Sequence, residues 1–427
     1  MNCPPELEVR QDILYTHRMD TKTQAVRSLY ELFPYPSGSP TIRTGFDARY
    51  LLGLGVLERP TGRPIRVLDA GCSRGLGTLA CAALQPDVEF LGVDINRVAL
   101  QEARQEAQRR GLTNIVFAEA DLSTLEGVNI PEGGFDVIQS SGVLHHLVDP
   151  ESGLRLLAGA LAPHGILSLM VYSESGRRET LRIAAALGTM IDKQKPLEEQ
   201  LVDARAAVQS VAACDEASAA WREAALLDDV EFVDRYLHVQ EQAYAIPDLW
   251  RLIEAGGLSF LRWSDPPAWS VDARRHGTVV AEQASGLGPM ETAHLVDTLG
   301  TAPKVLEAYL CHPGNSPRPE PDLEGIASTL LAVHPELSFH LSNRNLWRST
   351  RVEALAVELR GGEQQTLAPG PLRDLAFVLK DQNEPFYGES LIGFLTDSGV
   401  PAAEARQAVC FALSLEWMYQ PHPVDLG

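Results

Sequence analysis

Acidic residues and glycines that could hold a small ligand follow an apolar run early in the chain. The segment Val67–Thr78 places Asp69 directly before a turn that contains Gly71, Gly75 and Gly77. Glycines let a backbone turn sharply and approach a ligand closely, and the helix start behind them offers free N–H groups. A carboxylate at Asp69 can bind an ammonium group, but it would repel a pyrophosphate. The turn therefore favours a ligand that carries an amino-acid group.

The next two apolar runs also end near acidic residues. Asp94 follows Phe90–Val93, and a carboxylate at the end of such a strand can accept hydrogen bonds from both hydroxyls of a ribose. Its neighbour Ile95 can pack against an adenine ring. Asp121, after a third run, can accept a hydrogen bond from the adenine amino group. These residues predict a nucleoside beside the amino-acid group.

Two adjacent histidines and a tyrosine are candidates for the chemical step. His145 and His146 follow a fourth run, Phe135–Gln139, and either is a candidate general base. The alternative is a structural pair, one histidine buried and the other exposed. Tyr172 ends a later run and is a candidate to face the substrate, with core packing as the alternative. The pair Arg177–Arg178 predicts the solvated start of a helix.

Composition narrows the class of protein. The 427 residues are 45% hydrophobic and 22% charged, which is typical of a globular protein with about two domains. The formal net charge of −21 repels phosphate backbones, so nucleic acid is a poor candidate partner. Six scattered cysteines without metal-ligand spacing predict free thiols, a cytoplasmic location and no metal. We expect no membrane association, because no signal peptide is evident and no apolar run approaches about 18 residues.

The order of apolar runs predicts the fold. Between about residues 45 and 175, strand-like runs alternate with helical patterns, which indicates parallel βαβ units in a doubly wound α/β sheet. Residues 176–243 then predict a helical insertion. Strand signals resume at Leu258–Trp263 and Val305–His312. Four prolines between Pro313 and Pro321 mark a linker.

Taken together, these segments resemble the class I S-adenosylmethionine-dependent methyltransferases, closely over about 45–175 and more loosely over 258–312. The resemblance implies a Rossmann-like sheet of seven strands in the order 3-2-1-4-5-7-6, with the last strand antiparallel. It implies S-adenosyl-L-methionine as the cofactor and S-adenosyl-L-homocysteine as the product. The residues that we expect at the cofactor are Asp69, Gly71, Cys72, Gly75, Gly77, Asp94, Ile95, Asp121, Leu122 and Ser140.

A further resemblance is to a bacterial group of these enzymes that carries an extra helical block and a C-terminal domain. It rests on Tyr30–Pro36, Val171–Arg178 and Tyr236–Glu241. Some members of the group methylate lysines of proteins, and most have unassigned substrates. Independently of this resemblance, Tyr15, His17, Tyr30 and Tyr35 are candidates to form a lid over the cofactor.

The expected organisation has four parts. They are a lead-in or lid over 1–44, a methyltransferase domain over 45–315, a Pro-rich linker over 316–321, and a smaller, mainly helical C-terminal domain over 322–427 with some likeness to a winged helix.

The expected activity is methyl transfer to a nitrogen or oxygen nucleophile of a peptide or protein side chain, or of a specialised metabolite, by a protein that can form a homodimer. Two alternatives stay open. One is an inactive methyltransferase-like binding or regulatory protein. The other is a dinucleotide-dependent oxidoreductase, which Asp69 and the GxxxGxG spacing disfavour.

Overall fold

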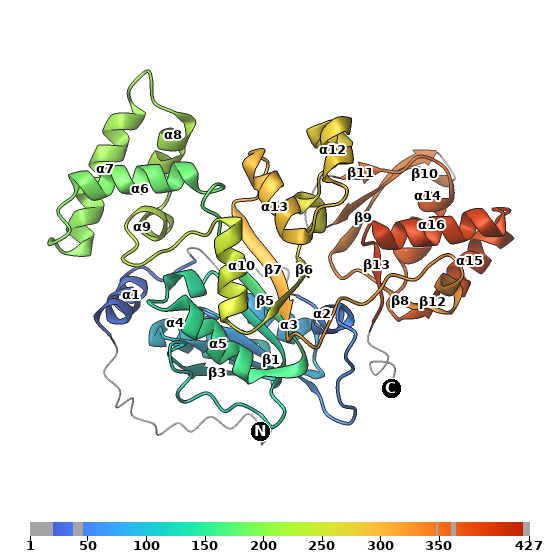
Figure 1. Ribbon diagram of the computed structural model, residues 1–427, viewed down its shortest axis with the longest axis horizontal. Coiled ribbons are helices and arrows are strands. Elements are labelled where there is room, and N and C mark those ends of the chain that lie inside the picture. Colours follow the sequence, from blue (N-terminus) through green and yellow to red (C-terminus); the bar gives the residue numbers. More distant parts are fainter. Residues whose placement is uncertain (1–19, 37–45, 347–348, 360–363, 422–427) are drawn as a thin grey trace. The chain divides into compact units, whose positions relative to one another are not determined.

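The computed structural model describes residues 20–36, 46–346, 349–359 and 364–421. The chain divides into two compact units: residues 1–45 with 64–314, and residues 46–63 with 315–427 (Figure 1). Residues 46–63, which we expected in the methyltransferase domain, contain helix α2 (Ala48–Gly53) and belong to the C-terminal unit. Residues 46–63 pack with a part of the chain that lies more than 250 residues later, which no local sequence pattern indicates.

The first unit is built on a seven-stranded sheet in the order β3-β2-β1-β4-β5-β7-β6. β7 is antiparallel to both of its neighbours, and the pairs among β1 to β5 are parallel. The predicted doubly wound methyltransferase fold and its strand order are therefore confirmed. The strands are β1 (Ile65–Ala70), β2 (Val88–Asp94), β3 (Ile115–Glu119), β4 (Phe135–Ser141), β5 (Leu161–Tyr172), β6 (Ser259–Trp263) and β7 (Val305–Cys311).

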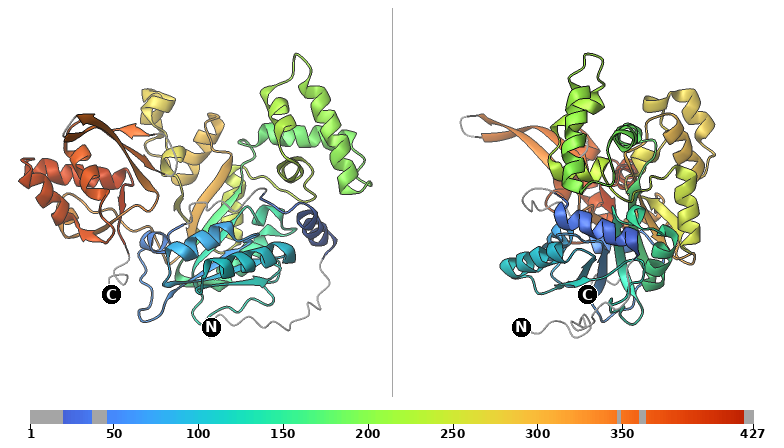
Figure 2. Two further views of the ribbon diagram at one scale, coloured as in Figure 1. Left: turned by 180° about the vertical axis from the view of Figure 1, so that it is seen from behind. Right: turned by 90° about the vertical axis from the view of Figure 1, so that its left-hand side faces the viewer.

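Helices cover both faces of this sheet. In Figure 1, α5 (Pro150–Ala160) and α10 (Ile246–Ala255) lie on the near face, and Figure 2 shows α3 (Leu76–Leu84) and α4 (Arg97–Arg110) on the opposite face. Apolar side chains of the strands and of α5 and α10 form the core between them. This burial supplies the main driving force for the layered arrangement. Further elements of this unit are η2 (Leu144–His146), η3 (Pro266–Trp269), α11 (Ala273–His276), α12 (Thr278–Ala284) and α13 (Pro289–Thr298).

The predicted insertion is a group of four helices with a core of its own. Leu187 and Phe232 are fully buried in this core, and Leu29 of the lead-in helix α1 (Thr21–Leu32) packs with them. The two ends of the insertion meet at the sheet, where Tyr244 N donates to Tyr172 O (2.8 Å). The insertion helices are α6 (Arg178–Met190), α7 (Leu197–Ala212), α8 (Ala219–Leu226) and α9 (Asp229–Tyr236).

The C-terminal unit contains two three-stranded sheets besides its helices, and the expectation of a mainly helical domain did not include these sheets. The long strands β9 (Leu337–Leu346) and β10 (Ser349–Leu359) form an antiparallel hairpin. The likeness to a winged helix stays a prediction. The remaining elements are η4 (Gly325–Ser328), β8 (Leu330–Val333), β11 (Gln365–Thr366), α14 (Pro371–Leu379), β12 (Phe386–Tyr387), α15 (Gly388–Asp397), α16 (Ala402–Ser414) and β13 (Met418–Tyr419).

Over the described ranges, no helix combines the length and the apolar character that crossing a bilayer would require.

Candidate active site

The turn between β1 and α3 depends on two of its three glycines. Gly71 (φ +98°) and Gly75 (φ +69°) adopt backbone conformations that disfavour other residues. A Cβ on Gly71 would lie 2.2 Å from Val143 Cγ2, and one on Gly75 would lie 2.7 Å from Phe117 Cζ. Gly77 is exposed, and space around it is open. The turn therefore requires glycine at 71 and 75, whereas the structure gives no steric reason for glycine at 77.

Asp94 stands at the carboxyl end of β2, where its carboxylate organises the neighbouring loops. Asp94 Oδ2 accepts from Ser73 N (2.7 Å), and Oδ1 accepts from Asn96 N (2.8 Å). Burial raises the pKa of Asp94, and these two bonds oppose that shift. A carboxylate has about four acceptor positions, so Asp94 keeps acceptor capacity for the ribose beside its bonds from the backbone. The geometry thus fits the role that the sequence predicts.

Asp69 and Ser140 lie on the adjacent strands β1 and β4. Asp69 accepts a hydrogen bond from the Thr78 hydroxyl, and burial raises its pKa to about 6, to which the nearby charge of Asp94 contributes. The Ser140 hydroxyl is fully buried and has no hydrogen-bond partner among the described residues. Buried polar groups are rarely left unpaired in folded proteins. The unpartnered Ser140 hydroxyl at the end of β4 could therefore form a hydrogen bond with a bound polar ligand.

Other predicted cofactor residues lie along the same edge. Cys72 is buried in the turn, and its N–H donates to Val93 O (2.9 Å). Ile95 is partly exposed beside Asp94. Asp121 is buried and caps its own turn by accepting from Ser123 N (2.8 Å). The Leu122 side chain packs in the core of the sheet. Their contacts with adenine stay predictions.

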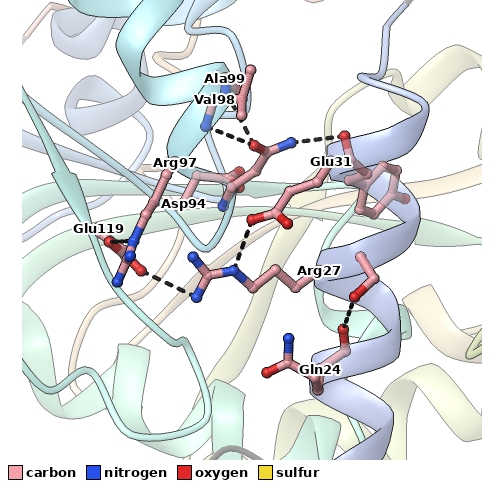
Figure 3. Close-up of polar contacts among 11 residues, drawn as sticks. Gln24, Arg27, Glu31, Asp94, Arg97, Val98, Ala99 and Glu119 are labelled. Atoms are coloured by element: carbon pink, nitrogen blue, oxygen red, sulfur yellow. Dashed lines mark hydrogen bonds and ion pairs between the residues drawn. The ribbon is translucent and has the colours of Figure 1, made fainter.

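The lead-in segment lies against the loops around Asp94. Asn96 Nδ2 donates to Tyr30 O (2.9 Å), and Ser73 Oγ donates to Tyr35 O (2.5 Å). Arg27 of α1 contacts Glu31 (2.9 Å) and Glu119 (3.3 Å), as Figure 3 shows. The predicted position of Tyr30 and Tyr35 near the cofactor loops is consistent with these contacts. Tyr15 and His17 lie outside the described residues.

The three candidate catalytic residues form one cluster. The ring of His145 lies 4.0 Å from that of Tyr172 and 4.2 Å from that of His146. Both histidines are buried, so the expectation of one buried and one exposed was wrong. His146 Nδ1 donates to Gln240 O (2.9 Å), whereas neither ring nitrogen of His145 has a partner among the described residues. Burial lowers the pKa of His146 to about 4 and also lowers that of His145, so both are neutral at pH 7.

Arg177 departs from the solvated position that the sequence predicts. Its guanidinium carbon lies 3.5 Å from the centroid of the Tyr172 ring, and Nη2 lies 3.5 Å from Glu241 Oε1. The side chain of Arg177 is only 11% exposed, whereas Arg178 is exposed as expected. Arg177 therefore joins the two ends of the insertion beneath Tyr172.

Sequence reasoning missed three more members of the cluster, all from the far end of the insertion. Asp234 Oδ1 accepts from Tyr30 Oη (3.0 Å), the ring of His238 stacks on His146 at 3.9 Å, and Glu241 faces Arg177. Burial raises the pKa of Asp234 to about 6 and that of Glu241 to about 7. They lie some 60 to 95 residues after Tyr172 or His146. The segment Tyr236–Glu241, on which the resemblance to the bacterial group partly rests, contains His238 and Glu241, but its pattern gave neither residue a place in the site.

The ligand atoms of His146, Asp234 and His238 lie within 4.8 Å of one another, close enough to raise the question of a metal ion. Two features oppose this assignment. The two imidazole rings are nearly parallel, at 27°, so their lone pairs do not converge on an ion about 2.1 Å away. His238 Nδ1 accepts from Gln240 N (3.1 Å), which places the proton of a neutral ring on Nε2. A metal ion could bind here only if the stacked imidazole rings turned toward it and His238 lost its hydrogen bond with Gln240 N or its Nε2 proton.

The fold and the carboxylate-and-glycine site define a class of enzymes that bind S-adenosylmethionine at the carboxyl edge of a seven-stranded sheet. Comparison with known proteins gives the same result. A family model described as "Methyltransferase domain" matches residues 63–223. An uncharacterized protein of Synechococcus is 33% identical over 71% of this chain and 74% of its own length.

Trans-aconitate 2-methyltransferase of Methylobacterium radiotolerans is 34% identical over 31% of this chain and 48% of that enzyme. Among solved structures, PKMT2 from Rickettsia typhi in complex with AdoHcy has a similar fold, with a TM-score of 0.66 at 15% identity over 91% of this chain and 78% of that one.

The chain belongs to the class I S-adenosylmethionine-dependent methyltransferases, and S-adenosylmethionine is its cofactor. The oxidoreductase alternative is therefore set aside. The buried, unpartnered Ser140 hydroxyl and the glycines at 71 and 75 fit such a cofactor.

Proposed function

We propose that this methyltransferase moves the methyl group of S-adenosylmethionine to the nitrogen of an amine, carried by a peptide or protein side chain or by a specialised metabolite. The observation that supports a nitrogen acceptor is the charge of the cluster that His145, His146 and Tyr172 form with Asp234, His238 and Glu241. Its histidines are neutral at pH 7, and of its two carboxylates only Glu241 has a cationic partner within 4.0 Å among the described residues. Such a site favours a ligand that arrives as a cation.

The residues of this chain have distinct tasks in the proposed reaction. Asp94 binds the ribose, and the turn at Gly71 and Gly75, with Asp69 and Ser140, binds the methionine portion. When bound, S-adenosylmethionine supplies an activated methyl group on a sulfonium, so the protein contributes orientation and electrostatics rather than a covalent intermediate. His145, His146 and Tyr172 form the wall behind the acceptor and exclude water. Arg177 fixes the orientation of the Tyr172 ring.

An oxygen acceptor is the second candidate, since one relative methylates trans-aconitate, a carboxylate. An anionic acceptor would need a cation in the cluster. Arg177 has two guanidinium nitrogens without a hydrogen-bond partner among the described residues, but Glu241 Oε1 lies 3.5 Å from Nη2 and offsets its charge, which leaves the Asp234 carboxylate without a cationic partner within 4.0 Å. The buried negative charge therefore favours the amine. The inactive binding protein of the sequence analysis would bind the cofactor without turnover. A homodimer stays a prediction, which light scattering would check.

An assay for S-adenosylhomocysteine release distinguishes these possibilities. We expect turnover with an amine panel of N-acetyl-lysine methyl ester, a lysine-containing peptide and spermidine, and none with trans-aconitate. The Asp94→Ala variant serves as the inactive control. Binding of S-adenosylhomocysteine without turnover of any amine would contradict the proposed acceptor, and turnover of trans-aconitate alone would establish the oxygen alternative.

A further inference from the structure

We infer that Asp234 is a catalytic residue that receives the proton lost by the acceptor amine, and that Tyr30 positions its carboxylate for this step. The inference rests on the proposed function. Neither the sequence motifs nor the comparisons assign Asp234, and the sequence gives Tyr30 only a place in a lid over the cofactor.

Asp234 is a buried carboxylate without a cation beside it. It is 4% exposed on α9, and its one hydrogen bond with a described residue comes from Tyr30 Oη (3.0 Å). No lysine or arginine of the described ranges lies within 4.0 Å of it, although Arg177 exerts a weaker attraction from further away. An unpaired buried charge is costly, so a cationic ligand at this position would stabilise the site.

The neighbours of Asp234 do not neutralise it. Burial lowers the pKa of the nearby histidines, which therefore carry no charge at pH 7. Of the charged groups, Arg177 is paired with Glu241, and Arg235 is paired with Glu231 on α9 itself. The titratable and charged groups around Asp234 are Tyr30 from α1, His146 from η2, Tyr172 and Arg177 at the end of β5, Glu231 and Arg235 on α9, and His238 and Glu241 after α9.

A second observation points to a polar ligand in the same place. His145 is fully buried with both ring nitrogens unpartnered, and His238 Nε2 is also buried and unpartnered among the described residues. Polar atoms of this kind usually bind a ligand or water when they have no protein partner. The His145 ring contacts His146 and Tyr172, and His238 stacks on His146, so these atoms belong to the cluster that contains Asp234.

Tyr30 connects Asp234 to the cofactor side of the site. Its carbonyl accepts from Asn96 Nδ2 (2.9 Å), and Asn96 N donates to Asp94 (2.8 Å). Its phenol donates to Asp234 Oδ1, which leaves Oδ2 for the acceptor. One residue of the lead-in helix thus contacts both the ribose-side loop and the acceptor-side carboxylate. Through Tyr30, the carboxylate is positioned relative to the cofactor loops.

The proposed step balances as a proton transfer followed by a displacement. The acceptor ammonium R–NH3+ gives one proton to the Asp234 carboxylate, which becomes a carboxylic acid and leaves a neutral amine. The amine lone pair then forms the N–CH3 bond while the S–CH3 bond breaks, which yields R–NH2+–CH3 and S-adenosylhomocysteine. Burial raises the pKa of Asp234 to about 6, close to working pH, as suits a general base. His146, with a pKa of about 4, is the weaker base.

The test uses an analogue that places an amine at the reacting position without any acceptor. In sinefungin, CH–NH2 replaces the S–CH3 of S-adenosylmethionine. Calorimetry with the full-length protein compares sinefungin with S-adenosylhomocysteine. We expect sinefungin to bind roughly ten- to a hundredfold more tightly at pH 8, which is the contribution of one hydrogen bond between charged groups.

The variant Asp234→Asn should remove this preference and leave the affinity for S-adenosylhomocysteine unchanged. Asp229→Asn is the matched control, because it removes the same charge from an exposed position on the same helix. A preference for sinefungin that persists in Asp234→Asn overturns the inference. Failure of S-adenosylhomocysteine to bind the wild-type protein would instead overturn the cofactor assignment on which the proposed function rests.

The role of Tyr30 has its own readout. In the wild-type protein the preference for sinefungin should disappear as the pH falls through about 6, because Asp234 becomes protonated. The Tyr30 hydrogen bond lowers the pKa of Asp234, so Tyr30→Phe should move this midpoint to higher pH. Tyr236→Phe, a buried tyrosine of α9, is the control that should not move it. An unchanged midpoint in Tyr30→Phe would show that Tyr30 has a structural role only.

A zinc titration completes the test. If Zn2+ binds stoichiometrically to the wild-type protein and not to Asp234→Asn, the carboxylate is a metal ligand and the inference fails. We expect no such binding, and we expect the preference for sinefungin to be the same with and without EDTA.

Discussion

Replacing Asp234 by asparagine should stabilise the ligand-free protein at neutral pH, although it should abolish catalysis. Burial raises the pKa of this carboxyl from 3.8 to about 6. Between these values the folded protein binds more protons than the unfolded chain, so wild-type stability increases as the pH falls through this window. Asparagine does not titrate and can still accept the hydrogen bond from Tyr30.

The size of the effect follows from the two pKa values. One pKa unit corresponds to about 1.4 kcal/mol, so ionising Asp234 in the folded state costs roughly 3 kcal/mol above about pH 7. The variant Asp234→Asn should therefore have the higher free energy of unfolding by roughly this amount at about pH 8. The corresponding rise in Tm is on the order of 5 °C. Below about pH 3 the difference should vanish, because the wild-type carboxyl is then neutral in both states.

Thermal unfolding of the ligand-free proteins, followed by circular dichroism at several pH values, measures this difference. Asp229→Asn is the control, since that carboxylate is 63% exposed and its ion pair with Arg205 contributes little to stability. Contributions of the neighbouring histidines cancel when variant and wild type are compared at the same pH. An offset that does not change with pH, or a variant less stable than wild type at pH 8, would refute the reasoning.

Two further predictions concern the cofactor side of the site, and a third concerns the core of the helical insertion. Asp94→Ala should weaken S-adenosylhomocysteine binding by roughly a hundredfold or more in calorimetry, since two charge-assisted hydrogen bonds to the ribose are lost. The control Asp87→Asn, directly before the first residue of β2, should have no effect on this affinity. Gly71→Ala should lower both Tm and cofactor affinity, because its Cβ would overlap Val143; Gly77→Ala, in an open helical position, should leave Tm unchanged or raise it by a few degrees. Leu29→Ala should lower the free energy of unfolding of the insertion core by about 2–5 kcal/mol, because it leaves a cavity where α1 packs against the insertion helices. Faster proteolysis of α1 would detect this weaker packing.

The cofactor half of the site could be predicted from the sequence because its residues are local to the strands that carry them. In a parallel sheet, successive strand ends meet at one edge, so Asp69 and Asp94 must come together once the strand pattern is identified. The glycines at 71 and 75 are marked in the same way, since a sharp turn after a strand requires positive φ.

The acceptor half could not be predicted in the same way. Asp234 and His238 reach His146 only because the insertion returns to the sheet, where Tyr244 pairs with the end of β5. The exposure of a side chain is likewise a tertiary property. The sequence Arg177–Arg178 predicts two solvated cations, yet one of them is buried against Tyr172.

The amino-acid sequence alone determined the class of fold, because the alternation of strands and helices follows from short-range patterns that repeat along the chain, and the resemblance of its motifs to a known family implied the strand order and the cofactor. Only the tertiary structure decided which groups join the cluster of His145, His146 and Tyr172, where we propose that the acceptor binds, and how they are charged. Burial and charge depend on segments that are distant in sequence, and the energy of an ionisable group changes by several kcal/mol between water and a packed interior.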